Sequence, residues 1–343
     1  MRALVKERPA KGLALKEVPV PRPGPGDVLI RVKRVGLCGT DAHIYMWNAW
    51  AAGRLKPPVI IGHEFAGEIV EMGPGVKGFQ SGETVTAEGH LACGACPQCR
   101  TGNAHICRDV RIIGVDRDGA FADFIVMPAG NVWKIDPEIS LDIAAIHDPL
   151  GNAFHAVMSA DVRGRSVLVT GCGPIGLFCI GIAKASGASR IFASEVQPAR
   201  IELAKMMGAH HALNPAGGDL EEAIRSQTDG LGVDVVLEMS GHPLAIHAAF
   251  RLVRDGGELC LLGLPDAEVS LDLARDLIFK GITVKGIIGR RMFDTWYAMR
   301  SYLRARLFDP SPVITHRFGI GDFERALAAI QSGAGKVILS LED

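Results

Sequence analysis

The sequence predicts an α/β protein of two domains, a β-rich, barrel-like unit and a doubly wound sheet of parallel strands. Three observations carry this prediction. The 343 residues exceed the length of one typical domain. Short β-branched segments separated by Gly and Pro continue to about residue 147. Beyond Asp148, short apolar runs alternate with segments of helical length, which is the pattern of βαβ units.

The first part of the chain contains short predicted strands set off by turns. Residues 28–32 follow a Pro- and Gly-rich segment at 23–27, and we expect a strand there. Residues 67–73 form a second expected strand, and residues 82–85 begin a third. The frequent Gly and Pro residues between these runs favour a β-rich barrel over a helical domain.

The second part reads as a parallel sheet. Residues 166–170 form a continuous β-run of the type buried on both faces, and further short apolar runs occupy 191–193, 233–237 and 257–262. The C-terminal segment carries a predicted helix near 323–332 and a strand at 336–339, and we expect it to return to the first domain. The predicted domains are therefore 1–147 together with 293–343, and 148–292.

The composition excludes several classes of protein. Lys plus Arg number 37 and Asp plus Glu number 38, so no basic excess indicates nucleic acid as a partner. Charges interrupt the N-terminus at once, and the apolar run Ile175–Ala183 is too short to cross a bilayer. We expect a cytoplasmic protein without a membrane partner, in which the eight cysteines stay reduced.

Four cysteines gather within 15 residues, inside a lobe at about 88–108. Cys93, Cys96, Cys99 and Cys107 have the spacing C-x2-C-x2-C-x7-C. Four thiolates can surround one tetrahedral Zn²⁺ and leave no open position, so the pattern predicts a structural zinc site. Two disulfides are disfavoured by the reducing compartment, and the ferredoxin spacing C-x2-C-x2-C-x3-C-P of an iron–sulfur protein is not met.

A glycine pattern follows the strand at 166–170. The residues from Gly171 through Gly173 and Ile175 to Gly176 read G-x-G-x-x-G and precede a helical run. Such glycines permit a tight turn, close approach of the backbone to a pyrophosphate, and packing of helix on strand. The context predicts a dinucleotide site, with a plain strand-to-helix turn as the alternative.

The next predicted strand ends at an acidic residue. Glu195 lies 24 residues after Gly171, where a carboxylate can accept hydrogen bonds from ribose hydroxyls. Because the same charge repels a 2′-phosphate, NAD is favoured over NADP. Arg200 weakens this preference slightly, since an Arg can serve a phosphate, although it could equally flank the adenine.

A second set of metal-ligand residues occurs early in the chain. Cys38 and His63 are suitable zinc ligands, and Glu64 or Asp148 could supply an oxygen. Two or three protein ligands and a water form a catalytic site, because an open position must receive the substrate. A single Cys of this kind is more often a buried thiol, and a single His is more often a turn residue. The presence of the cysteine lobe and the glycine pattern in the same chain favours a metal site.

Taken together, these motifs resemble the zinc-containing medium-chain alcohol dehydrogenases. The resemblance covers essentially the whole chain in the right order. Five segments are most similar to the branch of this family that oxidises L-threonine; they begin at Cys38, Asp148, Gly289, Pro312 and Gly335. The resemblance implies a GroES-like catalytic domain, a Rossmann domain, NAD as cofactor, two Zn²⁺ per subunit and a homotetramer.

The resemblance also implies roles for individual residues. Cys38, His63 and Glu64 would bind the catalytic zinc, with the acidic Asp148 near the metal, and Thr40 and His43 match a proton relay. The backbone would line the nicotinamide at residues that follow later strands: Leu262, Gly263, Leu264, Ile287 and Ile288. The substrate hydroxyl would lose its proton through the relay and its hydride to the cofactor.

Two alternative functions are open at this stage. A polyol dehydrogenase of the sorbitol type, or a 2,3-butanediol dehydrogenase, shares the same zinc chemistry. A catalytically silent protein that senses dinucleotides belongs to a different class, and the retention of Cys38, His63, Glu64, Thr40 and His43 argues against it. The remaining cysteines are expected to be small buried hydrophobes: Cys172, Cys179 and Cys260.

Overall fold

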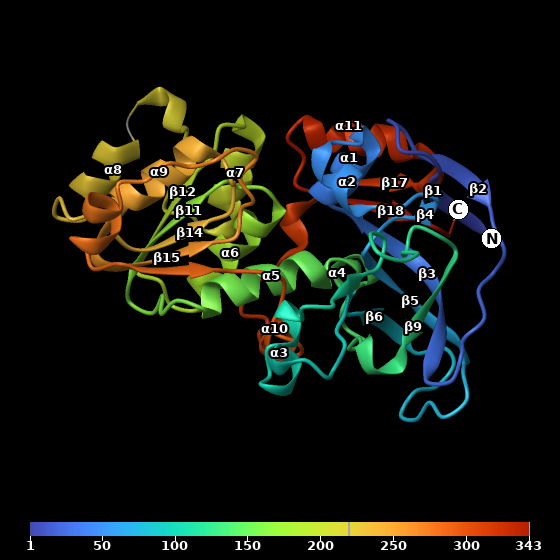
Figure 1. Cartoon of the computed structure of the whole chain (residues 1–343). Helices are drawn as coiled ribbons and strands as arrows, with labels where there is room; N and C mark the ends of the chain where they lie inside the picture. The colour runs from blue at the N-terminus through green and yellow to red at the C-terminus, as the bar shows by residue number, and fades with distance from the viewer. Residues whose placement is uncertain (219, 343) are drawn as a thin grey trace. The chain divides into compact units, whose positions relative to one another are not determined.

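The structure is a computed structural model that describes residues 1–218 and 220–342 (Figure 1). It divides into two compact units, which are described separately. Unit 1 comprises Met1–Asp148, Ile314–Ser332 and the residues from Lys336 onward; unit 2 comprises Pro149–Val313 and Gly333–Gly335. Among the described residues, no helix is long and apolar enough to cross a membrane.

Unit 1 is built around a mainly antiparallel seven-stranded sheet. Its strand order is β10-β6-β5-β3-β18-β17, with β9 also paired to β3. The strands of this sheet are β3 (Asp27–Leu37), β5 (Glu64–Met72), β6 (Thr84–Ala87), β9 (Phe124–Pro128), β10 (Val132–Lys134), β17 (Ile314–Gly319) and β18 (Lys336–Ser340). The predicted strands at 28–32, 67–73 and 82–85 therefore correspond to β3, β5 and β6.

Smaller elements complete unit 1. A three-stranded sheet has the order β2-β1-β4, and β7 pairs with β8. These strands are β1 (Arg2–Lys6), β2 (Ala14–Glu17), β4 (Val59–Ile60), β7 (His90–Leu91) and β8 (Arg111–Ile112). The helices are α1 (Gly39–Met46), α2 (Ala49–Arg54), α3 (Pro97–Arg100), α4 (Leu141–Ala145) and α11 (Phe323–Gln331). The chain ends meet here, since Arg2 donates to the carbonyl of Leu341 at 2.7 Å.

Unit 2 is a six-stranded sheet in which every strand pair is parallel. The order is β13-β12-β11-β14-β15-β16. The strands are β11 (Ser166–Thr170), β12 (Arg190–Ser194), β13 (His211–Leu213), β14 (Val233–Glu238), β15 (Val253–Leu261) and β16 (Thr283–Gly286). The helices are α5 (His147–Met158), α6 (Pro174–Ala185), α7 (Pro198–Met207), α8 (Leu220–Ser226), α9 (Pro243–Leu252) and α10 (Asp294–Arg304), with a π-helical turn at Ala274–Ile278.

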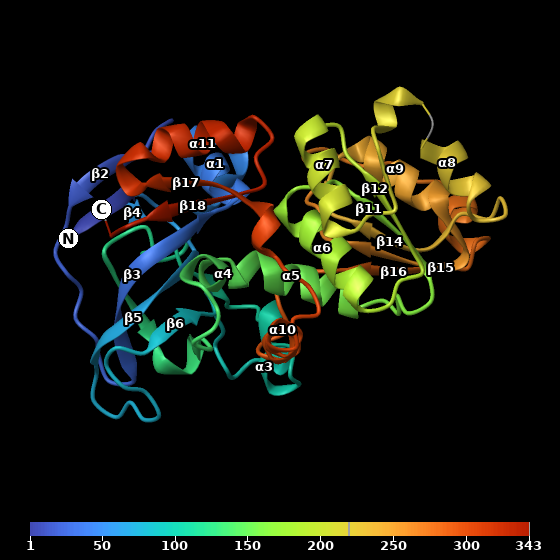
Figure 2. The same cartoon turned by 180° about the vertical axis from the view of Figure 1, so that it is seen from behind.

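The strand order of unit 2 creates a switch point. The chain moves outward from β11 to β13, then returns to β14 beside β11 and moves outward the other way. Right-handed crossovers therefore put α6 and α7 on one face of the sheet and α9 on the other (Figure 2). The carboxyl ends of β11 and β14 are where such sheets bind ligands. The predicted fold class, a β-rich unit with a doubly wound parallel sheet, is confirmed.

The C-terminal return to unit 1 begins later than the sequence indicated. We expected it at residue 293, but unit 2 continues to Val313. The reason is that α10 packs inside unit 2: Tyr302 meets the ring of Phe154 edge-on at 5.2 Å, and its hydroxyl lies 3.1 Å from that of Ser186. Trp296 and Met299 on the same helix are buried. The apolar face of this helix, which no motif marks, decides the boundary.

Candidate active site and metal centres

Two groups of metal-ligating side chains occur among the described residues. One comprises Cys38, His63 and Glu64, and the other comprises Cys93, Cys96, Cys99 and Cys107. Within each group, all the candidate ligand atoms lie within 4.8 Å of one another. Both sets match those that the sequence indicated, and both lie in unit 1.

The strands of unit 1 bring the first group together. Cys38 follows β3 and caps the N-terminus of α1, while Glu64 begins β5 directly after His63. Cys38 and Glu64 are 26 positions apart in the sequence. The pairing of Gly36 with Glu64 between β3 and β5 brings them close together in space. Gly62 has φ +94°, and a Cβ there would overlap the ring of Phe121, so this turn requires glycine.

The charge distribution around His63 favours a cation. Its Nδ1 atom is buried without a hydrogen-bond partner. Burial lowers the pKa of His63, but a hydrogen bond to Cys38 and the charges of Cys38, Asp41 and Asp148 outweigh this and raise it to about 10. A pocket with neighbouring negative charge that offers sulfur, nitrogen and oxygen donors fits Zn²⁺.

Asp41 is a buried residue of this region to which the sequence assigned no role. One carboxylate oxygen accepts from the backbone N–H of Cys38 at 2.8 Å, and burial raises the pKa of Asp41. The contact fixes Cys38 at the N-terminus of α1. A carboxylate three residues after a helix cap is a recognisable capping signal, and this could have identified it.

The predicted relay residues lie on α1. The thiol of Cys38 is 3.6 Å from the hydroxyl of Thr40, so Thr40 borders the metal group. His43 is exposed, one helical turn beyond Thr40, and its Nδ1 lies 2.9 Å from the amide nitrogen of Asn48. Side chains three apart on a helix are neighbours, so the two residues can form a path from the metal group toward solvent.

Asp148 is not a member of the three-residue ligand group. It is buried in the first turn of α5, and its charge acts on His63 and raises the pKa of Glu64. Glu64 lies within the group, with burial as the main cause of its raised pKa. The geometry therefore favours Glu64 as the oxygen ligand and leaves Asp148 as a neighbouring negative charge.

The cysteine lobe has the dimensions of a four-thiolate zinc site. Its Sγ atoms are 3.4 Å apart for Cys96 and Cys99, 3.8 Å for Cys96 and Cys107, and 4.0 Å for Cys93 and Cys99. Sulfurs at 2.3 Å from a tetrahedral ion are separated by about 3.8 Å, whereas a disulfide needs about 2.05 Å. Backbone N–H groups lower the pKa of Cys96 to about 6, whereas burial raises the pKa of Cys99 to about 12. The lobe fits Zn²⁺.

The glycine loop in unit 2 has the geometry of a dinucleotide site. Gly171 has φ +81°, and a Cβ at Gly176 would overlap the carbonyl oxygen of Gly171. Gly173 caps α6 and faces open space, since a Cβ there would meet nothing within 4 Å. The first and third glycines are thus required by packing, and the second leaves room for a phosphate at the helix N-terminus.

Glu195 and Arg200 are both engaged with backbone. The carboxylate of Glu195 accepts from the N–H groups of Cys172, Val196 and Gln197 at 2.8–2.9 Å, so it ties the glycine loop to the end of β12. Arg200 donates to the carbonyl of Ala334 at 3.0 and 3.1 Å, within unit 2. In this arrangement the guanidinium holds a loop rather than facing open solvent.

The expected nicotinamide-lining segments lie at the carboxyl ends of β15 and β16. Leu262, Gly263 and Leu264 follow β15, while Ile287 and Ile288 follow β16. Leu264 and Ile288 are strongly exposed, whereas Ile287 is buried and donates its N–H to the carbonyl of Leu261. The N–H groups of Leu262 and Gly263 donate to the carbonyl of Glu238, so this segment is tied to the end of β14.

The sequence analysis did not select Glu238, a buried carboxylate at the same edge of the sheet. Glu238 ends β14 and accepts from the hydroxyl of Thr170 at 3.3 Å and from the N–H groups of Ser240 and Gly241 at 2.9 and 3.1 Å. It therefore joins β11 to the loop after β14. An acidic residue at the end of an apolar predicted strand is a pattern from which Glu238 could have been selected.

Comparisons with known proteins show which family the chain resembles. Residues 24–137 match the alcohol dehydrogenase GroES-like domain, and residues 174–304 match a zinc-binding dehydrogenase domain. The chain is 48% identical to L-threonine 3-dehydrogenase of Caldanaerobacter subterraneus subsp. tengcongensis, over 99% of this chain and 98% of that one. It is 46% identical to L-threonine 3-dehydrogenase of Pyrococcus abyssi, over 100% and 99%.

This chain belongs to the zinc-containing medium-chain alcohol dehydrogenases. Among solved structures it is similar to an alcohol dehydrogenase of Escherichia coli CFT073 complexed with NADH, with a TM-score of 0.91, 28% identity and 99% of each chain covered. Family membership confirms that unit 1 carries the GroES-like domain and unit 2 the Rossmann-type sheet.

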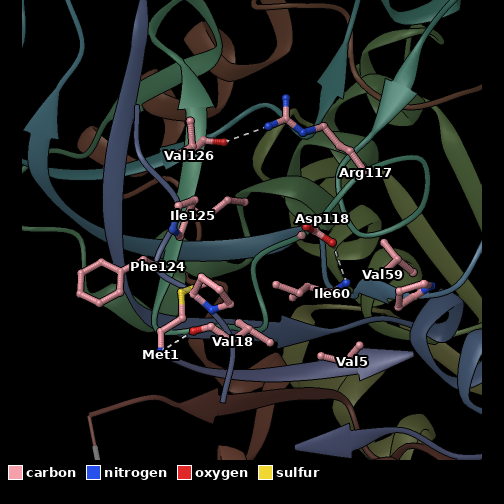
Figure 3. A pocket seen from close by; sticks show the side chains of 14 residues that line it. Met1, Val5, Val18, Val59, Ile60, Arg117, Asp118, Phe124, Ile125 and Val126 are labelled. Carbon is pink, nitrogen blue, oxygen red and sulfur yellow. Dashed lines mark hydrogen bonds between the residues drawn. The ribbon is translucent and has the colours of Figure 1, made fainter. Parts of the chain in front are cut away.

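A cavity of about 350 Å³ in this dehydrogenase lies away from the site residues. Its lining is mainly apolar and includes Val5, Val59, Ile60 and Phe124 (Figure 3). One of its polar side chains, Asp118, accepts from the N–H of Ile60 at 2.9 Å. None of the predicted catalytic, metal or cofactor residues lines it, so this cavity does not mark the active site.

Two glycine substitutions separate packing from ligand binding in the dehydrogenase. We expect Gly176→Ala to lower the melting temperature, because overpacking costs about 1–3 kcal/mol, and to weaken NADH binding. Gly173→Ala should leave the melting temperature unchanged and raise the dissociation constant for NADH about tenfold, because its Cβ occupies the phosphate space. Thermal unfolding and NADH fluorescence titration measure both; equal effects at the two positions would contradict the assignment.

Proposed function

We propose that this dehydrogenase oxidises the hydroxyl-bearing carbon of L-threonine and reduces NAD⁺ to NADH. The product is 2-amino-3-oxobutanoate, with one proton released, and the reaction belongs to threonine breakdown toward glycine. The observation that carries the proposal is the full-length similarity, at 46–48% identity, to relatives named L-threonine 3-dehydrogenase. The convergence of Cys38, His63 and Glu64 supports it, because a catalytically silent relative would not need this group.

The residues of unit 1 supply the binding and proton-transfer functions. A zinc ion held by Cys38, His63 and Glu64 would act as a Lewis acid, which lowers the pKa of a hydroxyl bound to it. Thr40 borders the group and is placed to accept the hydroxyl proton. The exposed ring of His43 can then pass that proton to solvent, since an imidazole nitrogen can both accept and donate a proton.

The residues of unit 2 orient the cofactor that accepts the hydride. The N–H groups at the start of α6 would bind the pyrophosphate, with Gly173 leaving space for it. Glu195 disfavours a 2′-phosphate by charge, so NAD⁺ is the expected partner. Backbone groups from Leu262 to Leu264 and at Ile287 and Ile288 would fix the nicotinamide, while the cofactor itself carries the chemistry.

Removal of the relay histidine tests the proton path. We expect His43→Ala to reduce kcat about 10²-fold near neutral pH, the lower end for loss of a general acid–base group, while the KM for NAD⁺ stays unchanged. Added imidazole should restore part of the activity. The measurement is the pH profile of kcat, with Asn48→Ala as a control that removes the side chain contacting the His43 ring and capping α2. An unchanged profile in His43→Ala would exclude the relay.

We propose a homotetramer in the cytoplasm. The edge strand β16 is paired on one side only in the described sheet, and Val284, Phe279 and Ile278 near it are exposed. A second copy could extend the sheet there and cover these apolar side chains. All eight cysteines are free, which suits a reducing compartment. Light scattering on the wild type and on Val284→Lys measures the assembly.

A substrate panel tests the proposed function. NADH formation with L-threonine, sorbitol and 2,3-butanediol should show activity on L-threonine, with kcat/KM at least about 10²-fold above the other two, because a site built for the amino and carboxylate groups rejects analogues that lack them. Activity on sorbitol or 2,3-butanediol alone would establish the alternative function.

A further inference from the structure

A buried lysine borders the proposed catalytic group. Lys336 begins β18, and both Lys336 and Glu64 are only 1% exposed. The Lys336 ammonium forms an ion pair with the Glu64 carboxylate and donates to the carbonyl of Leu37, the residue before Cys38, at 2.7 Å. A lysine is almost never buried this deeply unless it is paired, so the contact is a specific one.

The register of three strands builds this ion pair. In the sheet of unit 1, β3 lies between β5 and β18, with Gly36 opposite Glu64 and Leu37 opposite Val337. A Cβ at Gly36 would overlap the Glu64 carboxylate and lie 3.0 Å from the Cε of Lys336. Gly36 therefore leaves the space in which the two charges meet, beside the strand end that carries Cys38.

The ammonium competes with a metal ion for the same carboxylate. A zinc ion held by Cys38 and His63 would attract the Glu64 carboxylate, which already pairs with the Lys336 ammonium. A catalytic zinc must keep a position open for the substrate oxygen, and a firmly bound carboxylate would fill it. We propose that Lys336 is a positioning residue that restrains Glu64 and keeps it a displaceable ligand of the catalytic metal. This inference rests on the catalytic zinc site proposed above.

The test measures metal affinity as well as turnover. Lys336→Gln removes the charge but keeps a donor for the Leu37 carbonyl. After selective replacement of the catalytic metal by Co²⁺, we expect about tenfold tighter Co²⁺ binding in competition with a chelator, a change in the visible Co²⁺ absorption, and kcat about tenfold lower. Lys336→Met, which refills the buried site with an apolar side chain, should behave alike, and Lys336→Arg should bind Co²⁺ as the wild type does.

Two controls separate this role from a purely structural one. Lys33 forms a different ion pair in the same sheet, with Glu68, which joins β3 to β5, and Lys33→Gln should not change Co²⁺ affinity. In a Glu64→Gln background, Lys336→Gln should no longer tighten Co²⁺ binding, because the restrained carboxylate is gone. Weaker or unchanged Co²⁺ binding in Lys336→Gln, or an equal gain in both backgrounds, would overturn the inference.

Failure of the inference and failure of the proposed function are distinguishable. Co²⁺ binding is measured without substrate, so a wild-type enzyme that is inactive on L-threonine but shows the expected affinity changes would overturn only the proposed substrate. An enzyme active on L-threonine in which Lys336→Gln does not tighten Co²⁺ binding would overturn only the role of Lys336.

Discussion

Replacement of Cys38 by serine is expected to abolish turnover while dinucleotide binding is retained. The thiolate is the only sulfur ligand in the three-residue group, and a serine hydroxyl is a poor substitute for it. Loss of Lewis acidity costs several kcal/mol of transition-state stabilisation, and about 4 kcal/mol corresponds to about 10³-fold lower kcat. The glycine loop belongs to unit 2, so the dissociation constant for NADH should not change.

Steady-state kinetics with L-threonine and fluorescence titration with NADH measure this pair of effects. The matched control is Cys260→Ala, which removes a buried thiol of β15 outside both ligand groups and should preserve activity. Full activity in Cys38→Ser would show that the catalytic metal is held elsewhere or is not required.

Removal of one lobe cysteine is expected to act on stability. Cys107 is buried and its sulfur accepts from the N–H groups of Cys93 and Asp109 at 3.3 and 3.4 Å, so it joins the two ends of the lobe. Structural zinc binding is coupled to folding. We expect Cys107→Ser to lose one zinc ion and to lower the melting temperature by roughly 10 °C or more, since about 3–4 kcal/mol shifts a domain of this size by that amount.

Zinc analysis and thermal unfolding monitored by circular dichroism measure the effect. Cys172→Ala is the control, because that thiol is buried in the glycine loop and belongs to neither ligand group. It should keep both zinc ions and nearly the wild-type melting temperature. If Cys107→Ser retained its zinc and its stability, the lobe would not be a structural metal site.

The elements that sequence could predict are those determined by local pattern. The run Ser166–Thr170 corresponds to β11 because a parallel strand covered on both faces must be apolar throughout. The lobe was recognisable because its four ligands lie close together in the chain. The end of unit 2 was not recognisable in the sequence. The helix α10 belongs to unit 2 because Tyr302 contacts Phe154, which is 148 residues away in the chain.

In the active site too, residues in short local motifs could be predicted and residues placed by long-range strand pairing could not. Cys38, His63 and Glu64 each lie in a short, recognisable segment, so residue type and resemblance sufficed to select them. Lys336 could not be selected, because its contact with Leu37 spans 299 residues and depends on the pairing of β18 with β3. Glu238 was hidden for a related reason, since its partner Thr170 lies on a neighbouring strand of the sheet.

We propose that two zinc ions have separate roles, one in catalysis at Cys38, His63 and Glu64 and one in stability at the lobe. The most direct measurement follows zinc content and L-threonine-dependent NADH formation together during graded treatment with a chelator. We expect activity to disappear as the first zinc ion leaves each chain, with the melting temperature still high, and to return when Zn²⁺ is added. Full activity after that ion has left, or loss of fold before loss of activity, would contradict the account.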